Sequence, residues 1–266
     1  MTTETFELDE VGSRGGTLRE VAGPLPEGAY TTLRTYGGRG VVRLAQHVLR
    51  LNESIVLQGG HGAVDEARVR RAIAAALERT GHSESRVRLR FAPPRLFVSV
   101  EPFRPFPEAL YRDGVACVTL GLRRPNPHAK DTRFVAAAEA AGKALPPGVH
   151  EGIMVGEDGA LLEGLSSNFF AVRDGRLRTE ESRALRGVTR SLVLELAPGV
   201  LPVALTAIRR SELPSLSEAF ITSASRGLMP VVTIDGTPIG DGRPGAFTRA
   251  LSAKFEDLIR REAESV

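Results

Sequence analysis

Three short segments of the chain carry side chains that could take part in catalysis. Lys130 follows a turn rich in Pro and Asn at positions 125–129, and an Ala-rich run comes after it. Glu163 begins the run EGLSSN at positions 163–168, and Gly187 begins the run GVTR at positions 187–190. A lysine amine can act as a nucleophile or move a proton, a carboxylate can pair with a cation, and the first amides of a helix favour an anion. Taken singly, each residue has an ordinary interpretation, so the order of the segments carries the information.

An earlier segment adds a candidate anion-binding arginine. Strand-like residues at 28–36 and a Gly-rich turn at 37–40 precede the run HVLRLNES at positions 47–54. Arg50 lies in this run, beside the apolar stripe of a predicted helix. On its own it would be a solvent-exposed helix arginine. The planar fork of its guanidinium could also hold two oxygens of a phosphate.

In this order, the strand, the Gly turn, the Arg50 segment, Lys130, the EGLSSN run and the GVTR run resemble the fold-type IV (class IV) pyridoxal-phosphate enzymes. That family includes branched-chain and D-amino-acid aminotransferases and aminodeoxychorismate lyase. The resemblance covers most of the chain, from about Gly28 to Gly245. It implies an α/β (α+β) two-domain protein of the D-amino-acid aminotransferase-like fold. A small N-terminal α/β domain would be followed by a larger C-terminal β-barrel-like domain with helices.

The resemblance implies pyridoxal 5'-phosphate (PLP) as the cofactor and gives Lys130 the catalytic role. The Lys130 amine would form the Schiff base with the cofactor and then move the proton of the substrate. Glu163 would pair with the pyridine nitrogen and keep it protonated. Arg50 would bind the phosphate together with the helix start after Gly187 and the small-residue loop at 222–225. The implied cofactor-binding residues are Arg50, Lys130, Glu163, Ser167, Asn168, Val188, Thr189, Ser223, Ala224 and Ser225.

On the substrate side, Tyr30 matches the aromatic residue that lines the pocket in this family. The candidates for the substrate carboxylate are Arg34, Arg90 and Arg95. Each of these arginines can equally be interpreted as a solvated strand residue. Two positions depart from the aminotransferase pattern, since Thr31 stands where many members have Glu and Val135 where branched-chain members commonly have Tyr. These departures leave the substrate open and do not affect the cofactor.

The leading interpretation is a PLP-dependent class IV aminotransferase (transaminase). It would move an amino group between an α-amino acid, of the D- or branched-chain type, and a 2-oxo acid. The alternative is an aminodeoxychorismate lyase, which would release pyruvate with the same cofactor and lysine. A third interpretation, a catalytically silent protein that only binds the cofactor, predicts the loss of Lys130 or Glu163, and both are present.

The overall composition argues against several other classes. The formal net charge is +3 at pH 7 and aromatic residues make up 5% with no Trp, so a basic nucleic-acid-binding face with stacking aromatics is not expected. The single cysteine, Cys117, lies in an apolar strand-like run, which predicts a buried structural thiol and a reducing compartment. The five histidines are scattered, so no metal site is expected. Without an apolar run long enough for a membrane, we expect a cytoplasmic protein, and the resemblance implies a homodimer with small-molecule substrates.

Periodicity predicts the elements that must position these residues. A strand at 28–36 comes first, followed by helices at 43–58 and 65–79, with Asp65 as the second N-cap and Gly81 just past that helix. Hairpin strands at 86–91 and 96–100 and a strand at 114–122 follow. The later half is predicted to contain helices at 134–143, 188–196 and 245–263, a hairpin at 154–162, and strands at 168–172, 203–208, 219–223 and 231–234. We expect domains at 1–120 and 128–266 with a linker at 121–127, where Pro residues punctuate the chain.

Overall fold

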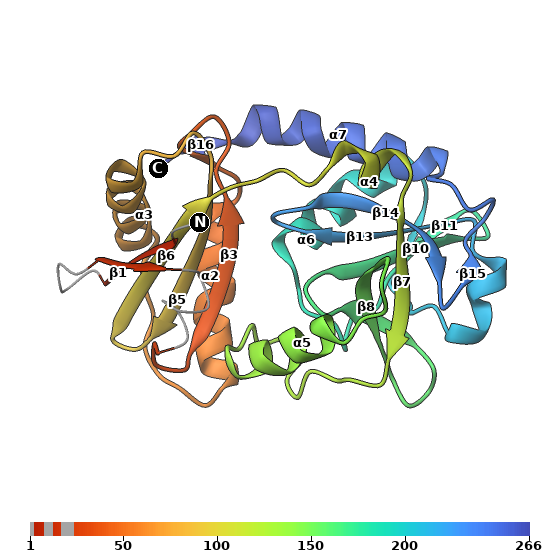
Figure 1. Ribbon diagram of the computed structural model, residues 1–266, viewed down its shortest axis with the longest axis horizontal. Coiled ribbons are helices and arrows are strands. Elements are labelled where there is room, and N and C mark those ends of the chain that lie inside the picture. Colours follow the sequence, from red (N-terminus) through yellow and green to blue (C-terminus); the bar gives the residue numbers. More distant parts are fainter. Residues whose placement is uncertain (1–2, 8–12, 17–23) are drawn as a thin grey trace. The chain divides into compact units, whose positions relative to one another are not determined.

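The computed structural model describes residues 3–7, 13–16 and 24–266. The chain forms two compact units, each built from more than one stretch of sequence. Unit 1 contains Met1–Pro105, Ala129–Arg133 and Ile259–Val266, and unit 2 contains Phe106–His128 and Phe134–Leu258. The elements of both units are labelled in Figure 1. In the part of the chain that the structure describes, no helix combines the length and the apolar character needed to span a membrane.

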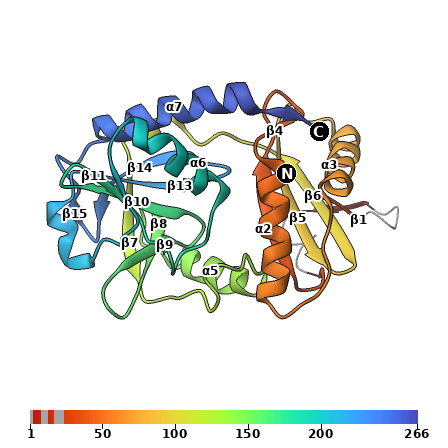
Figure 2. The same cartoon turned by 180° about the vertical axis from the view of Figure 1, so that it is seen from behind.

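Unit 1 is an antiparallel sheet of five strands against which two helices pack (Figure 2). The strand order is β2-β1-β6-β5-β3. The elements are β1 (Thr3–Glu7), β2 (Ser13–Gly16), β3 (Ala29–Arg34), β4 (Gly40–Val41), α2 (Leu44–Leu57), α3 (Glu66–Thr80), β5 (Ser85–Ala92), β6 (Arg95–Pro102) and β16 (Glu264–Ser265). The short strands β4 and β16 pair with each other outside the main sheet.

The two helices of unit 1 begin and end close to where the sequence predicts. In α2, the stripe at three- and four-residue steps that includes Leu44, Leu51 and Ile55 is buried in the core. In α3, the Asp65 side chain accepts a hydrogen bond from the Arg68 N–H at 2.7 Å, which makes Asp65 the N-cap. Gly81 ends the helix in the left-handed conformation, with φ 63. The apolar stripe and the cap residues therefore sufficed to define both helices.

A closed ring of strands forms the centre of unit 2. In the order β9, β10, β13, β14, β7 and β8, each strand pairs with the next, and β8 pairs again with β9. The strands are β7 (Val115–Leu120), β8 (Val149–Val155), β9 (Leu161–Gly164), β10 (Asn168–Arg173), β11 (Arg176–Arg178), β12 (Val203–Ala204), β13 (Glu218–Ser223), β14 (Gly227–Ile234) and β15 (Thr237–Pro238). The helical segments are α4 (Glu108–Arg112), α5 (Arg133–Lys143), α6 (Val188–Leu196), η1 (Ala197–Gly199), η2 (Arg210–Ser215) and α7 (Ala246–Glu262), of which α5 and α7 also extend into unit 1. Ile153, Phe169 and Ile221 fill the core of the ring together with the buried thiol of Cys117, whose pKa is raised by burial. This is the β-barrel-like part that the sequence predicts.

The structure differs from the expected elements in several strands, of which β8 and β14 begin earlier than predicted, at Val149 and Gly227. The strand predicted at 203–208 is wrong in length, because β12 ends at Ala204, where its partner β11 ends. Strands β1 and β2 were not predicted, since the N-terminal stretch is polar and shows no clear alternation.

The compact units also differ from the contiguous halves expected from the sequence. Residues 106–120 group with unit 2 because β7 lies between β8 and β14 in the ring. Ala129–Arg133 groups with unit 1 because its backbone bonds to β3 and to the residue preceding it. The role of 121–127 as an interdomain linker stays a prediction.

Candidate active site

The backbone of the Lys130 segment is fixed within unit 1. The Lys130 N–H donates a hydrogen bond to Ser54 Oγ on α2 at 3.0 Å, and the Lys130 carbonyl accepts one from the Tyr30 N–H on β3 at 2.9 Å. Thr132 bonds Gly28 twice, since its N–H donates to the Gly28 carbonyl and its Oγ1 accepts from the Gly28 N–H, both at 3.0 Å. These bonds set the point from which the lysine side chain departs, and they do not involve its amine.

The Lys130 amine lies over an aromatic ring, and a second cation lies near the same ring. Lys130 Nζ lies 4.7 Å from the centroid of the Tyr30 ring, and Arg88 Cζ lies 5.2 Å from the same centroid. Arg88 was not among the predicted site residues. The sequence held no local signal for it, because Arg88 on β5 pairs across the sheet with Thr32 on β3, two residues from Tyr30 on the same face, and two helices separate these strands in the chain.

Lys130 also stands apart from the other lysines of the chain. The sequence contains three lysines, Lys130, Lys143 and Lys254. Lys143 and Lys254 are exposed, whereas Lys130 is half-buried. A reagent that reacts only with a positioned amine therefore has one candidate, Lys130 in unit 1. The two solvent-exposed lysines serve as references for unselective labelling.

Thr31, His47 and Arg50 form a buried network in unit 1. Arg50 Nη2 donates to Thr31 Oγ1 at 2.7 Å, and Thr31 Oγ1 lies 2.7 Å from His47 Nδ1. With the His47 proton on Nε2, Nδ1 accepts the Thr31 hydroxyl proton, and with the proton on Nδ1 the ring donates to the threonine oxygen instead. Burial lowers the pKa of His47 well below its usual range, and the charges of Arg50 and Lys130 lower it further. Arg50 is 7% exposed, so it is not the solvent-exposed helix arginine of the simpler interpretation.

This network predicts a loss of stability on mild acidification. His47 stays neutral in the folded chain, whereas the unfolded chain binds a proton at this position below about pH 6.5. The free energy of unfolding should therefore fall as the pH drops through this value, with a slope that approaches about 1.4 kcal/mol per pH unit one unit below it. His47→Asn keeps an acceptor for Thr31 and cannot be protonated, so its thermal unfolding midpoint should depend less on pH between about 6.5 and about 5.5. If the unfolding midpoints of the wild type and the variant changed with pH in parallel, the neutral state of His47 in the folded chain would be contradicted.

The three candidate arginines for the substrate carboxylate have different surroundings. Arg34 Nη2 bonds Glu84 Oε2 at 2.6 Å. Arg90 is buried, and its Nη1 donates to the Leu25 carbonyl at 3.0 Å. Arg95 is exposed at the start of β6. Arg34 and Arg90 thus already hold parts of unit 1 together, and the choice of a carboxylate-binding arginine stays a prediction.

In unit 2, Glu163 is a buried carboxylate with several donors around it. Its Oε1 accepts a hydrogen bond from Arg124 Nε at 3.0 Å, and the two side chains are 3% and 5% exposed. Its Oε2 accepts from the Leu185 N–H at 3.0 Å, and Asn168 Nδ2 lies at 3.4 Å from the same oxygen. Asn168 Nδ2 also donates to the Leu185 carbonyl at 2.7 Å. These donors orient the carboxylate, and Oε1 can still accept one more donor.

Arg124 was not predicted as a site residue from the sequence. It lies in the Pro-punctuated stretch at 121–127, which shows no periodic pattern, and its partner is 39 residues away. A cavity of about 460 Å³ reaches Arg124 and Glu163 from the exposed turn that contains Glu157 and Asp158. Both Arg124 and the carboxylate expected to bind the pyridine nitrogen therefore line this cavity.

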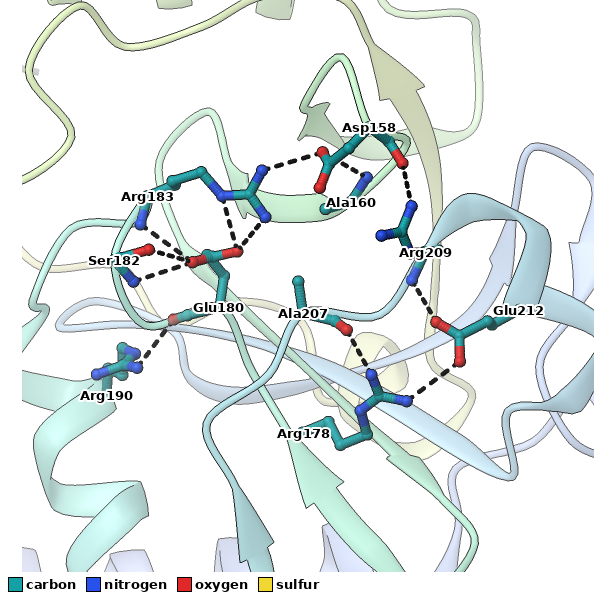
Figure 3. A network of polar contacts seen from close by, with 10 residues as sticks. All are labelled: Asp158, Ala160, Arg178, Glu180, Ser182, Arg183, Arg190, Ala207, Arg209 and Glu212. Atoms are coloured by element: carbon teal, nitrogen blue, oxygen red, sulfur yellow. Dashed lines mark hydrogen bonds and ion pairs between the residues drawn. The ribbon is translucent and has the colours of Figure 1, made fainter.

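The loop before α6 is held by the polar network shown in Figure 3. Arg183 donates to Glu180 Oε2 from Nε at 3.1 Å and from Nη2 at 2.7 Å, and to Asp158 Oδ1 from Nη1 at 3.0 Å. The hydrogen bond from Arg183 lowers the pKa of Asp158. Burial acts to raise the pKa of Glu180, but the donors from Arg183 and Ser182 outweigh it and the pKa is lowered. Because this loop carries Leu185, the network also helps to place the Leu185 N–H that donates a hydrogen bond to Glu163.

Two of the predicted phosphate-binding segments, the start of α6 and the end of β13, belong to unit 2, whereas Arg50 belongs to unit 1. Helix α6 starts after Gly187, and no described side chain caps its N-terminus. Helix α6 packs against β13, whose end carries Thr222 and Ser223. Thr222 Oγ1 is buried and has no hydrogen-bond partner among the described residues. An uncapped helix start beside an unsatisfied hydroxyl fits an anion, so these residues suit the phosphate of PLP.

Ser167 has a different neighbour from the one expected. Its Oγ donates to Glu151 Oε2 at 3.1 Å, and Ser166 Oγ donates to the same oxygen at 2.8 Å. The cofactor role of Ser167 stays a prediction. Glu151 is a second buried carboxylate of this unit that the sequence analysis did not single out, although a charged residue at the start of an apolar strand is a recognisable signal.

Gly187 gives a direct test of the packing at this helix start. A Cβ at this position would lie 2.1 Å from Asn168 Oδ1, so Gly187→Ala must displace the Asn168 side chain or the loop. We expect a loss of about 1–3 kcal/mol in the free energy of unfolding and weaker binding of PLP, measured by thermal unfolding and absorbance titration. Gly121→Ala is the matched control, because a Cβ there meets nothing within 4 Å. Equal behaviour of the two variants would show that the helix start tolerates the displacement.

Among the described residues, no group of three or more His, Cys, Asp and Glu side chains could hold a metal ion. The candidate groups for chemistry are the amine of Lys130 in unit 1 and, in unit 2, the carboxylate of Glu163 and the uncapped start of α6.

Known proteins share this arrangement of elements. The branched-chain amino acid aminotransferase of Escherichia coli superposes with a TM-score of 0.83 at 20% identity, covering 99% of this chain and 97% of that one. The branched-chain aminotransferase of Thermoproteus uzoniensis, solved with norvaline, gives 0.82 at 22% identity, covering 99% and 97%. At these identities the likeness shows the fold, which is that of class IV aminotransferases.

Sequence comparison identifies the family. The profile of the amino-transferase class IV family matches residues 28–234. The chain therefore belongs to the class IV aminotransferase family. The branched-chain-amino-acid aminotransferase of Pseudomonas aeruginosa is 31% identical over 134 residues, which cover 50% of this chain and 44% of that relative. The matched region thus spans about half the length of the curated relatives.

Proposed function

We propose that the chain is a PLP-dependent aminotransferase that moves an amino group between an α-amino acid and a 2-oxo acid through a Schiff base at Lys130. The observation that carries the proposal is the placement of Lys130, whose backbone is bonded to both β3 and α2 while its amine lies over the Tyr30 ring. Family membership supports the reaction class. The cofactor is supported by a structural neighbour, a branched-chain amino acid aminotransferase solved with pyridoxamine 5'-phosphate.

The cofactor supplies an aldehyde for the amino group and an electron-accepting ring for the developing negative charge. Lys130 would hold the aldehyde and, once released by the substrate amine, move the proton at the substrate α-carbon. Glu163 would pair with the protonated ring nitrogen through Oε1, since Arg124 and the Leu185 amide orient the carboxylate. Arg50, the start of α6 and the loop at Ser223–Ser225 would bind the phosphate.

The curated relatives support a proposal for the substrate class. Curated relatives at 31% identity are branched-chain-amino-acid aminotransferases, which favours an aliphatic α-amino acid as donor. The half-buried Tyr30 ring beside Lys130 provides an apolar surface compatible with such a side chain. We also propose the homodimer and the cytoplasmic location that the family resemblance implies, and light scattering of the purified protein tests the first.

The proposal is tested by the visible spectrum of the PLP-loaded protein, recorded after adding single L- or D-amino acids without any 2-oxo acid. We expect a yellow band that converts to the pyridoxamine form with branched-chain amino acids and returns on addition of a 2-oxo acid. The responding set gives the handedness and the side-chain class. A band that no amino acid converts, together with pyruvate release from aminodeoxychorismate, would replace the aminotransferase by the lyase.

A further inference from the structure

Glu151 is the centre of a buried polar cluster in unit 2. Its side chain is 4% exposed and lies at the start of the apolar part of β8. Oε2 interacts with Arg226 Nη1 at 3.2 Å and accepts from Ser166 Oγ and Ser167 Oγ at 2.8 Å and 3.1 Å. Oε1 accepts from the Gly152 N–H at 3.2 Å. A buried carboxylate with this many partners holds them at fixed positions, because losing any one leaves charge unsatisfied.

Arg226 joins this cluster to the loop between β13 and β14. It directly follows the run Ser223–Ser225, and its N–H lies 3.3 Å from Ser223 Oγ, to which it donates. Its carbonyl accepts from Tyr111 Oη at 2.8 Å, and its Nη1 also donates to Ser166 Oγ at 2.9 Å. The guanidinium is 14% exposed. The loop is thus attached through both the backbone and the side chain of one residue.

We propose that the Glu151–Arg226 ion pair is a positioning device that fixes the Ser223–Ser225 loop for the phosphate of the cofactor. This inference rests on the proposed function for the identity of the anion. Neither residue is assigned a contact with the cofactor. Both act through the loop, whose orientation relative to β8 and to the turn at 165–167 they determine.

The alternative to positioning is a purely electrostatic effect of the ion pair. The two explanations predict opposite changes in the affinity for phosphate. Glu151→Gln removes a negative charge and leaves Arg226 uncompensated next to the loop. If only charge mattered, a dianionic phosphate would bind more tightly in this variant. If the pair positions the loop, the same variant loosens the loop and binds the phosphate more weakly. Arg226→Lys separates the two further, because it keeps the charge but replaces the planar guanidinium, whose Nη1 contacts both Glu151 and Ser166, by a compact ammonium.

The experiment compares the dissociation constants of PLP and of pyridoxal, which lacks the phosphate, for the wild type and the variants. We expect Glu151→Gln and Arg226→Lys to weaken PLP about 10- to 100-fold and to leave pyridoxal unchanged. Glu157→Gln is the matched control, because Glu157 is 84% exposed and pairs with Arg123 at 2.9 Å in the same unit. Tighter PLP binding by Glu151→Gln, or an equal loss for PLP and pyridoxal, would overturn the proposal.

Hydrogen exchange without any cofactor provides an independent measurement. We expect faster exchange of the amides at 224–227 in Glu151→Gln and Arg226→Lys than in the wild type, with β3 and β5 unchanged. Ser167→Ala, which removes one hydrogen bond and no charge, should show a smaller change of the same kind. Unchanged exchange in this loop would overturn the inference. If the wild type bound neither PLP nor pyridoxal, the proposed function would fail while the exchange data still decided the positioning claim.

Discussion

Lys130→Ala is expected to abolish both the yellow band and the transamination activity of the PLP-loaded protein. The variant lacks the amine that we propose to hold the cofactor and to move the α-proton, and a proton transfer of this kind contributes a factor of about 10²–10⁴ to the rate. The fold should be retained, because the fixed bonds of this segment come from the Lys130 backbone N–H and carbonyl. The contact of the amine with the Tyr30 ring is lost, and such a contact contributes about 0.5–1 kcal/mol.

The matched control for this prediction is Lys130→Arg. Arginine keeps a cation over the Tyr30 ring but cannot form the Schiff base, so this variant should also be colourless and inactive. The thermal unfolding midpoint of Lys130→Arg should be closer to the wild-type midpoint than the midpoint of Lys130→Ala is. A yellow band that survives in either variant would place the chemistry on another amine.

Glu163→Gln should lower kcat by about 10²–10³ while the cofactor remains bound, because a neutral amide does not keep the ring nitrogen protonated. The same substitution leaves Arg124 as a buried guanidinium without its counter-charge, which costs about 3–5 kcal/mol in the free energy of unfolding. Activity and stability are therefore expected to fall together in this variant. Stopped-flow kinetics and thermal unfolding measure the two effects separately.

A double variant separates the two roles of Glu163. Replacing Arg124 by Met in the Glu163→Gln background removes the unpaired charge, so the unfolding midpoint should recover while kcat stays low. If kcat recovered with stability, the carboxylate would serve the fold alone. A wild-type kcat in Glu163→Gln would contradict its assignment to the ring nitrogen.

Features that depend on local sequence were predicted well. The alternation of β3, the apolar stripe of α2 and the Asp65 cap are encoded within a few residues, and each is confirmed in the structure. The hairpin around Asp158 was equally readable from its turn residues. The error at 203–208 has the opposite origin, since the length of β12 is set by the short partner strand β11 and not by its own residues.

Partners of the candidate catalytic residues could not be predicted, because they are remote in sequence. Arg124 reaches Glu163 across 39 residues, and Arg226 reaches Ser166 across 60. In each case the sequence shows a charged or polar residue without its counterpart, and only the strand order of the barrel brings the two together. The network of Thr31, His47 and Arg50 was partly visible, since His47 and Arg50 are one helical turn apart, but the role of Thr31 as their link was not.

The most direct test of the account is borohydride reduction of the PLP-treated protein followed by peptide mass spectrometry. Reduction fixes the cofactor on the amine that holds it, and the chain offers only Lys130, Lys143, Lys254 and the N-terminus. We predict that the phosphopyridoxyl label is found on Lys130 at about one per chain, with the exposed Lys143 and Lys254 labelled no more than in a denatured control. A label spread over all three lysines, or absent from Lys130, would contradict the assignment on which the account depends.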